Sequence, residues 1–273
     1  MVIIMDLLIL QNKVTEIVQQ AADKYFSIAT TVIEKDGAAN IVTDADLNVQ
    51  QFLMENLKDL LPCSSFLCEE NDVVNTNTEF VWIIDPIDGT TNFARGLYEC
   101  AISVGLLQNG DSVLGVVYAP RLNLLFSATK GGGAFCNGNK IHTSTKNFSQ
   151  SILCTAFCLY RKEFAKPCAN VILEALPLCN DVRRFGSCAF ELCLLACGKC
   201  DLFFEYMVFP WDYAGAYLIL TEAGGIISGY NKQQLDFKNQ TTIIAANNIL
   251  NFEKLNDIVL NNITNMPTFK EEK

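Results

Sequence analysis

The sequence contains a single histidine, His142, and its 20 lysines and arginines form no run. No arginine stands beside His142, which argues against a phosphohistidine mechanism. A Cys-x5-Arg phosphatase loop is absent as well, because Arg183 and Arg184 stand at the wrong spacing from Cys179. The formal net charge is −10, whereas a nucleic-acid backbone is bound by clustered basic residues. We therefore expect no nucleic-acid partner.

Long hydrophobic runs are absent too. No apolar run reaches the roughly 18 residues needed to cross a bilayer. The apolar start of the chain contains Asp6 and has no basic residue before Lys13, whereas a secretory signal begins with a basic region. These features predict a cytoplasmic protein with no membrane partner.

Cysteine is abundant, with twelve residues, but the spacing suggests no disulfide framework. The tightest group is Cys188, Cys193, Cys197 and Cys200. A zinc or iron–sulfur site would need a second ligand pair at a suitable spacing, and the sequence offers none. Cys193 and Cys197 lie four residues apart in an apolar helical pattern, so packing is their predicted role.

The most informative stretch is residues 82–96, WIIDPIDGTTNFARG. Residues 80–84 are β-branched or aromatic and stop before Pro86, which predicts a buried strand. Asp85 and Asp88 follow at the end of this strand, and Gly89 and the threonines after it are predicted to open a helical turn. Carboxylates at a strand end beside exposed N–H groups suit divalent cations that in turn bind phosphate. An Asp-rich turn is the alternative interpretation.

Helix and strand patterns fill the rest of the chain. Helices are predicted over residues 7–25, 162–176, 187–196, 211–223 and 250–260, and strands over 65–68, 152–157, 201–205 and 241–246. Asn109-Gly110-Asp111 predicts a hairpin. We therefore expect an α+β protein with one domain, residues 1–273. Its subdomains would cover about residues 1–146, an α+β part with the metal site, and 147–273, an α/β part on the substrate side.

Two more acids stand near predicted element ends. Glu69 follows the strand 65–68, and Asp212 follows Pro210 in the first turn of a helix. Taken alone, Asp212 would be interpreted as stabilising the helix N-terminus by about 1 kcal/mol. Asp44-Ala-Asp46 has the DxD spacing of aspartyl-phosphate phosphatases, but a helix pattern follows it and it does not cleanly end a strand.

Together these stretches resemble the inositol monophosphatase family, the lithium-sensitive, Mg²⁺-dependent phosphatases. The Glu-Glu signature stands at residues 69–70, Asp-Pro-Ile-Asp-Gly-Thr-Thr-Asn at 85–92, and Trp-Asp-x-Ala-Gly…Glu-Ala-Gly-Gly at 211–225. Arg-Phe-Gly-Ser at 184–187 and Phe-Glu at 204–205 also match. Cys68 replaces the usual glycine before the acidic pair and Tyr217 is bulky, but neither change removes a ligand. The resemblance implies a layered α-β-α-β-α sandwich of the sugar-phosphatase type.

The resemblance also implies a site for two or three Mg²⁺ ions. Its protein ligands would be Glu69, Asp85, the backbone carbonyl of Ile87, Asp88 and Asp212. Hard oxygen ligands suit Mg²⁺, and carboxylates crowded together need metal charge to offset their repulsion.

The implied mechanism is in-line attack on phosphorus by a metal-activated water, with a second metal at the leaving alkoxide. Thr90 and Asp46 would position and deprotonate this water, and Glu69 would assist. Lys35 would hold an outer metal water, with a solvated surface amine as the alternative. The implied substrate-binding residues are Asp88, Gly89, Thr90, Gly186, Ser187, Cys188, Glu205 and Asp212.

The family's default substrate is a myo-inositol monophosphate, a small phosphorylated cyclitol. Fructose 1,6-bisphosphate or 3′-phosphoadenosine 5′-phosphate would need a second anion pocket, for which Arg183 and Arg184 are the candidates. A subunit or intersubdomain contact is the preferred interpretation of these arginines. A transcription-associated binding protein on the same fold is an alternative class, but the complete set of expected groups favours an enzyme. By the same resemblance we expect a homodimer.

Overall fold

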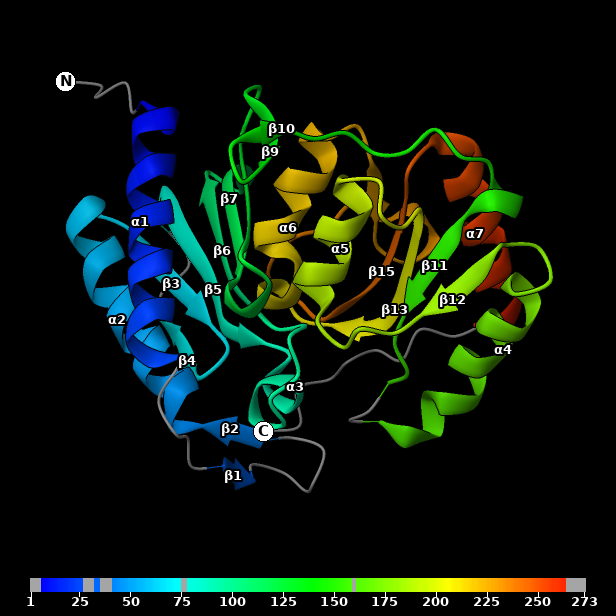
Figure 1. The fold of residues 1–273 in the computed structure, drawn as a ribbon, viewed down its shortest axis with the longest axis horizontal. Helices are drawn as coiled ribbons and strands as arrows, with labels where there is room; N and C mark the ends of the chain where they lie inside the picture. The colour runs from blue at the N-terminus through cyan, green and yellow to red at the C-terminus, as the bar shows by residue number, and fades with distance from the viewer. Residues whose placement is uncertain (1–5, 27–31, 35–40, 75–77, 159–160, 264–273) are drawn as a thin grey trace.

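The computed structural model describes residues 6–26, 32–34, 41–74, 78–158 and 161–263. Its elements stack in five layers, in the order helices, sheet, helices, sheet, helices (Figure 1). The layered α-β-α-β-α sandwich predicted from the sequence is confirmed. The functional residues of interest lie where the two sheets and the middle helices meet.

The first layer contains α1 (Leu7–Tyr25) and α2 (Asp44–Leu60). Asp6 caps α1 by accepting hydrogen bonds from the N–H groups of Leu8 and Ile9, which satisfies donors that the helix itself cannot use. The bounds of α1 match the predicted helix. Both helices bury an apolar stripe against the first sheet, with the fully buried residues Val14, Val18, Val49, Leu53 and Leu57.

The first sheet has eight strands in the order β10-β9-β8-β7-β6-β5-β3-β4. β3 runs parallel to β5, and the other neighbours are antiparallel. The predicted hairpin joins β6 to β7, with positive φ at Asn109 and Gly110. A separate two-stranded sheet pairs β1 (Val32–Glu34) with β2 (Ile41–Thr43). The strands are β3 (Ser65–Cys68), β4 (Asn71–Val74), β5 (Phe80–Asp88), β6 (Ala101–Gln108), β7 (Asp111–Ala119), β8 (Leu124–Thr129), β9 (Gly133–Cys136) and β10 (Asn139–Lys140).

The strand β5 is longer than predicted. It continues through Pro86 to Asp88, and its register against β6 shifts between Asp85 and Asp88. The prediction that the strand stops before Pro86 was wrong, because a proline is tolerated where a bulge interrupts the ladder. Residues three apart in a regular strand point to opposite faces. The bulge therefore lets both carboxylates line the same pocket.

The second sheet has five strands in the order β12-β11-β13-β15-β14. β11 is parallel to β12 and β13, whereas β15 is antiparallel to β13 and β14. α4 (Ala165–Ala175) and α7 (Ile249–Asn262) cover its outer face (Figure 1). The strands are β11 (Ile152–Thr155), β12 (Asp181–Arg183), β13 (Leu202–Val208), β14 (Ile226–Ser228) and β15 (Thr241–Ala246), the last with the predicted bounds.

The middle layer contains α5 (Cys188–Ala196) and α6 (Pro210–Glu222), packed between the two sheets. α6 lies very close to the first sheet at Gly215. A Cβ there would come within 2.6 Å of Ser103 Oγ, so only glycine allows this approach. The contact fixes the first turn of α6, which carries Asp212, beside the end of β5.

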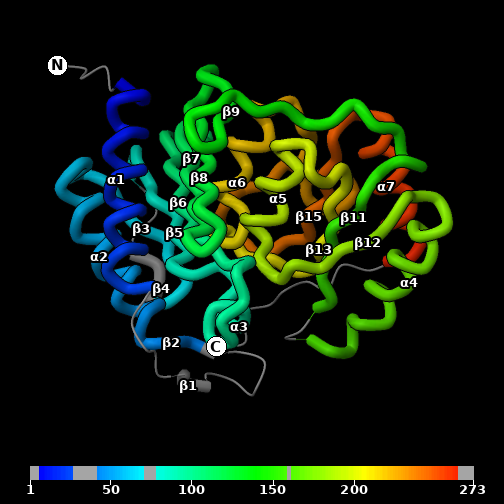
Figure 2. Tube along the Cα trace, in the orientation of Figure 1, coloured from blue at the N-terminus to red at the C-terminus, as the bar shows by residue number. Residues whose placement is uncertain are grey.

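Residues 141–151 connect the two sheets and run across one end of the sandwich (Figure 2). The amide of Asn247 holds this connection by donating to the carbonyls of Ser144 and Lys146. The predicted boundary near residue 146 falls here. Because the middle helices pack on both sheets, the division into residues 1–146 and 147–273 stays a prediction.

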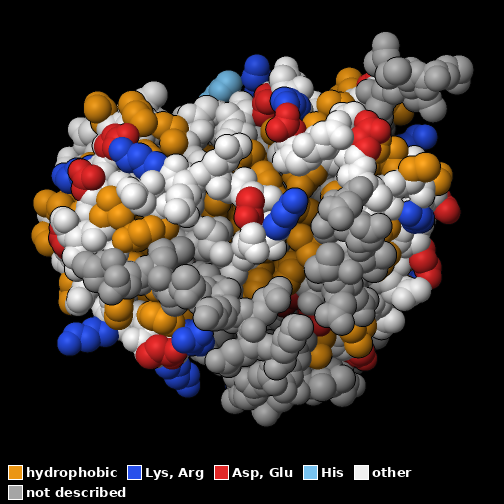
Figure 3. Space-filling view, turned by 180° about the vertical axis from the view of Figure 1, so that it is seen from behind, with side chains coloured by type: hydrophobic (Ala, Val, Ile, Leu, Met, Phe, Trp, Pro, Cys, Tyr) orange, Lys and Arg blue, Asp and Glu red, His pale blue; other side chains and the backbone are white. Residues whose placement is uncertain are grey.

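Three further observations concern the surface, the length of the helices and the cysteines. Acidic and basic side chains are scattered among apolar and neutral ones on the face seen in Figure 3. In the part of the chain that the structure describes, no helix is both long and apolar enough to cross a membrane. All twelve cysteines lie in this part and are free thiols, and Cys193 is fully buried, as packing predicts.

Candidate active site

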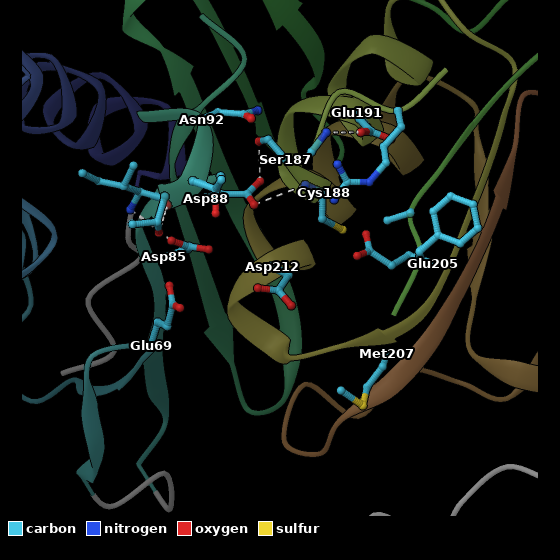
Figure 4. A pocket seen from close by; sticks show the side chains of 18 of the residues that line it. Glu69, Asp85, Asp88, Asn92, Ser187, Cys188, Glu191, Glu205, Met207 and Asp212 are labelled. Atoms are coloured by element: carbon cyan, nitrogen blue, oxygen red, sulfur yellow. Dashed lines mark hydrogen bonds between the residues drawn. The ribbon is translucent and has the colours of Figure 1, made fainter. Parts of the chain in front are cut away.

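A pocket of about 250 Å³ opens where the two sheets and the middle helices meet (Figure 4). Side chains from both halves of the chain line it. β5 and the short helix α3 (Thr90–Ala94) contribute one wall, and α5, α6 and β13 contribute the other. The predicted site residues in its lining are Glu69, Asp85, Ile87, Asp88, Gly89, Thr90, Gly186, Ser187, Cys188, Glu205 and Asp212.

Glu69 directly follows β3, and Asp85 lies beside it in the neighbouring strand β5, just before the bulge. The N–H of Glu69 extends the parallel pairing of β3 with β5 by donating to the carbonyl of Ile84. Asp85 is buried, and its Oδ1 accepts the N–H of Ile87 at 3.0 Å. Burial, the carboxylates around it and a hydrogen bond with Glu69 raise the pKa of Asp85 well above its ordinary value.

Asp88 joins the first sheet to the start of α5. Its carboxylate accepts hydrogen bonds from Ser187 Oγ at 2.6 Å and from the N–H groups of Cys188 and Ala189 at 3.2 and 2.6 Å. It therefore caps a helix that begins 100 residues later in the sequence. Burial raises the pKa of Asp88 to about 6, although these hydrogen bonds lower it.

Asp212 reaches the same pocket from α6. Its Oδ2 accepts the N–H of Phe209 at 2.7 Å, so the carboxylate caps the helix, as the simpler interpretation of the sequence required. Burial, and next the charges of Asp88 and Glu69, raise the pKa of Asp212 well above its ordinary value. The residue thus combines a capping role with a place in the carboxylate cluster.

Asp46 lies next to Thr90, and their proposed roles on the attacking water stay a prediction. Thr90 Oγ1 is 3.2 Å from Asp46 Oδ1 and 3.1 Å from the carbonyl oxygen of Ile87. The other oxygen of Asp46 accepts the N–H of Thr43 at 2.8 Å and completes the capping box of α2. Burial raises the pKa of Asp46 to about 6. A buried carboxylate held next to a hydroxyl can accept a proton through it.

Gly89 lies where α3 begins, with φ +87°, a conformation that favours glycine. A Cβ at this position would lie 3.0 Å from the carbonyl oxygen of Gly186. The two loops, one from each half of the chain, therefore touch through their glycines. A side chain at Gly89 would press on the carbonyl of Gly186, and one at Gly186 would crowd the amide of Asn92.

Glu205 lies on β13 at the opposite end of the pocket (Figure 4). Burial, followed by the charges of Glu191 and Asp88, raises its pKa to about 8, and a hydrogen bond with Cys188 lowers it. This end also contains Arg184, the one basic residue among the described residues that line the pocket. Hydrogen-bonding groups in a partly buried wall suit the hydroxyls of an alcohol.

Sequence reasoning missed several residues that line this pocket, and two of them, Asn92 and Glu191, make specific hydrogen bonds to its loops. Asn92 Nδ2 donates to the carbonyls of Glu99 and Phe185, both at 2.6 Å. Glu191 accepts backbone hydrogen bonds from the loop before α5. Asn92 belongs to the central motif, but its partner lies 93 residues away. The signal for Glu191 was an acid in an otherwise apolar helix.

Three other residues singled out from the sequence are not among the described residues that line the pocket. Lys35 falls outside the described residues, so its predicted role stays a prediction. Arg183 forms an ion pair with Asp181 at 2.6 Å and does not line this pocket. His142 is exposed, as expected.

The donor set fits Mg²⁺. Every candidate ligand is an oxygen. Burial, and next the charges of neighbouring carboxylates, raise the pKa values of Asp85 and Asp212, and a cation would offset those charges. Among the described residues, however, no three acidic, cysteine or histidine side chains already stand at the spacing that one ion requires. The convergence of these carboxylates on shared ions therefore stays a prediction.

Comparison with known proteins agrees with the fold and the pocket. Residues 4–264 match the inositol monophosphatase family. An inositol monophosphatase of Dictyostelium discoideum is 35% identical over 236 residues, which cover 84% of this chain and 86% of the relative. The Nus factor SuhB of Escherichia coli is 36% identical over 196 residues, 71% of this chain and 73% of the relative. The solved structure of a Thermotoga maritima IMPase superposes with a TM-score of 0.82 at 27% identity, covering 95% of this chain and 99% of that one.

Fold and pocket together define a phosphoric monoester hydrolase of the layered-sandwich type. The chain belongs to the inositol monophosphatase family, whose members depend on Mg²⁺ and act on small phosphorylated substrates.

Proposed function

We propose that the protein is a Mg²⁺-dependent phosphatase that hydrolyses myo-inositol monophosphate. One observation carries this proposal: carboxylates from three distant stretches line a single pocket, beside the hydrogen-bonded pair of Thr90 and Asp46. A hydrolase needs cation ligands and a proton acceptor around one space. The pocket offers candidate ligands, and Thr90 in its lining connects it to Asp46 behind the wall.

Two or three Mg²⁺ ions would be held by Glu69, Asp85, the carbonyl of Ile87, Asp88 and Asp212. When bound, these ions supply positive charge that attracts the phosphate and eases ionisation of water. Asp88 retains capacity for this role, because three hydrogen bonds leave part of its carboxylate free.

The chain's own residues would handle the proton. Thr90 Oγ1 donates to Asp46 Oδ1, which leaves the oxygen of the hydroxyl free to accept a hydrogen bond from the attacking water. The proton would pass through this hydroxyl to Asp46, whose raised pKa makes it a better base than an exposed aspartate. Glu69 would assist from the adjacent strand.

The alcohol would lie against Gly186, Ser187, Cys188 and Glu205, with Glu205 accepting hydrogen bonds from its hydroxyls. Arg184 at this end lies close to Glu191 and Glu205 and lowers the pKa of both, so its charge is shared with two acids and does not form a free site for a second phosphate. Arg183 is engaged by Asp181, which weakens the case for a second anion pocket. A monophosphate is therefore preferred over fructose 1,6-bisphosphate and 3′-phosphoadenosine 5′-phosphate.

A substrate panel tests the proposal. Phosphate release from those three compounds would be measured with EDTA, with Mg²⁺, and with Mg²⁺ plus Li⁺. We expect the inositol monophosphate to give the highest kcat/KM, to require Mg²⁺ and to be inhibited by Li⁺. Faster turnover of a bisphosphate, or turnover in EDTA, would contradict the proposed substrate or cofactor.

The similarity to a protein named Nus factor SuhB supports a second candidate, a transcription-associated binding role. Asp85→Asn would separate the two functions, because a binding role should survive this substitution while hydrolysis should not. The homodimer and the cytoplasmic location stay predictions.

A further inference from the structure

The mechanism above does not use Glu191, although this residue lines the pocket. It lies in the first turn of α5 and is 2% exposed. Its Oε1 accepts the N–H groups of Phe185 and Gly186, at 2.7 and 2.8 Å. Its Oε2 is buried and has no hydrogen-bond partner among the described residues. A buried carboxylate is costly, so this position calls for an explanation.

Asn92 forms a hydrogen bond with the same peptide group from the other wall of the pocket. The carbonyl of Phe185 and the N–H of Gly186 belong to one peptide unit. Asn92 Nδ2 donates to that carbonyl at 2.6 Å, while Glu191 accepts that N–H. The 185–186 peptide is thus held at both ends, by α3 on one side and by α5 on the other.

The next peptide unit, between Gly186 and Ser187, lies directly on the start of α3. Gly186 has φ +84°, and its carbonyl oxygen would lie 3.0 Å from a Cβ at Gly89. The next residue, Ser187, donates to Asp88. The spacing between the turn at Gly89 and the wall at Gly186 therefore depends on how the 185–186 peptide is held.

Stabilisation of the α5 N-terminus alone does not account for Glu191. A first-turn acid stabilises a helix through the helix dipole while exposed to solvent, so that role does not require burial. Here the carboxyl is buried, and burial raises its pKa to about 7. The nearby guanidinium of Arg184 lowers that pKa, but the hydrogen bonds to the carboxylate come from the two backbone N–H groups. The specific feature is the pair of hydrogen bonds to one loop.

We propose that Glu191 is a positioning residue that, together with Asn92, sets the distance between the phosphate end and the alcohol end of the pocket. The inference rests on the proposed function, because it assigns the wall at Gly186, Ser187 and Cys188 to the substrate's alcohol. Glu191 would act through the backbone without touching the substrate. Its loss should therefore weaken alcohol recognition more than it slows the chemistry.

The first test compares variants at this position on two substrates. Glu191→Ala removes the acceptor, Glu191→Asp shortens its reach, and Glu191→Gln retains a carbonyl acceptor of the original length. For myo-inositol 1-phosphate we expect KM to rise about 10-fold or more in the Ala and Asp variants, since misplacement by about 1 Å can cost 100-fold. For p-nitrophenyl phosphate, which has no hydroxyls, KM should change less than about 3-fold. Glu191→Gln should restore most of the loss.

Glu222 provides a matched control. It makes a similar clamp far from the pocket, accepting the N–H groups of Gly131 and Gly133 at 2.7 and 2.8 Å. Glu222→Ala should lower the melting temperature without changing the ratio of the two KM values. Equal effects on both substrates, or a Gln variant no better than Asp, would overturn the proposal. If the Ala variant does not fold, the comparison of Asp with Gln still decides.

Amide hydrogen exchange tests the bridge without reference to turnover. The N–H of Gly186 should exchange slowly in the wild type and in Glu191→Gln, and at least about 10-fold faster in Glu191→Asp. Unchanged exchange would show that Glu191 does not hold the loop. If exchange changes as expected but the wild type does not hydrolyse inositol phosphate, the proposed function fails while the structural bridge stands.

Discussion

Thr90 donates a hydrogen bond of 3.2 Å to Asp46, although 44 residues separate them in the sequence. The same carboxylate belongs to the capping box of α2. The helix start therefore fixes the orientation of Asp46, and α3 brings the hydroxyl to it. A proton acceptor whose geometry is set by a helix cap needs little reorganisation during turnover.

The first prediction concerns this pair. Thr90→Ala and Asp46→Asn should each lower kcat by about 100-fold or more, the usual size of a general-base contribution, with little change in KM. The double variant should be hardly slower than either single one, because the two residues act as a unit. Steady-state kinetics on inositol 1-phosphate would measure this.

Asp44→Asn is the matched control, because Asp44 also lies in the first turn of α2 but is not bonded to Thr90. It should keep kcat within about 3-fold of the wild type. A large loss on replacing Asp44 would instead favour the aspartyl-phosphate interpretation of Asp44 and Asp46. Additive losses at Thr90 and Asp46 would contradict their joint role.

The second prediction concerns Asp85. Asp85→Asn should reduce kcat by about 1,000-fold or more, since cation charge at the reacting phosphate contributes several kcal/mol. In EDTA the same variant should be at least as stable as the wild type, because one of the mutually repelling carboxylates is gone. Calorimetry and phosphate release would show the two effects together. Retained turnover would refute the ligand assignment.

The third prediction concerns the cation itself. Adding Mg²⁺ at about 100 times its dissociation constant should stabilise the protein by about 2.7 kcal/mol, or roughly 5 °C in melting temperature. NaCl at equal ionic strength should not reproduce the shift, and Asp85→Asn should lose most of it. An equal shift in melting temperature in the wild type and the variant would show that the stabilising cation binds at another site.

The fourth prediction concerns pH. The pKa of Glu205 is raised from 4.5 to about 8, so between these values the folded state binds more protons than the unfolded state. Stability in EDTA should then fall as pH rises from about 5 to 8.5. Glu205→Gln should make the fall less steep and should raise the melting temperature at pH 8. If stability fell equally steeply with pH in the variant, Glu205 would not be the cause of the pH dependence.

Much of the carboxylate cluster could be predicted from the sequence because its members stand in local patterns. Asp85 and Asp88 follow the apolar run 80–84, and Asp212 lies in the first turn of an apolar helix. The helix α1 was predictable to its exact bounds because its apolar stripe has a regular period. Each of these patterns lies within one short stretch of the sequence, so it can be recognised without the tertiary structure.

The bulge in β5 and the clamp on the 185–186 peptide could not be predicted. Periodicity does not reveal where a strand shifts its register against a partner. The hydrogen-bond donors to Glu191 are backbone N–H groups, which no sequence pattern distinguishes. Asn92 contacts Phe185 from the opposite wall of the pocket. Such contacts are set by tertiary packing.

The most direct test of the account is a crystal grown with Mn²⁺ in place of Mg²⁺ and measured at the manganese absorption edge. We expect at least two anomalous peaks, bounded by carboxylate oxygens of Glu69, Asp85 and Asp212. A map without peaks, with these side chains turned away from one another, would contradict the central claim that they hold the catalytic cations.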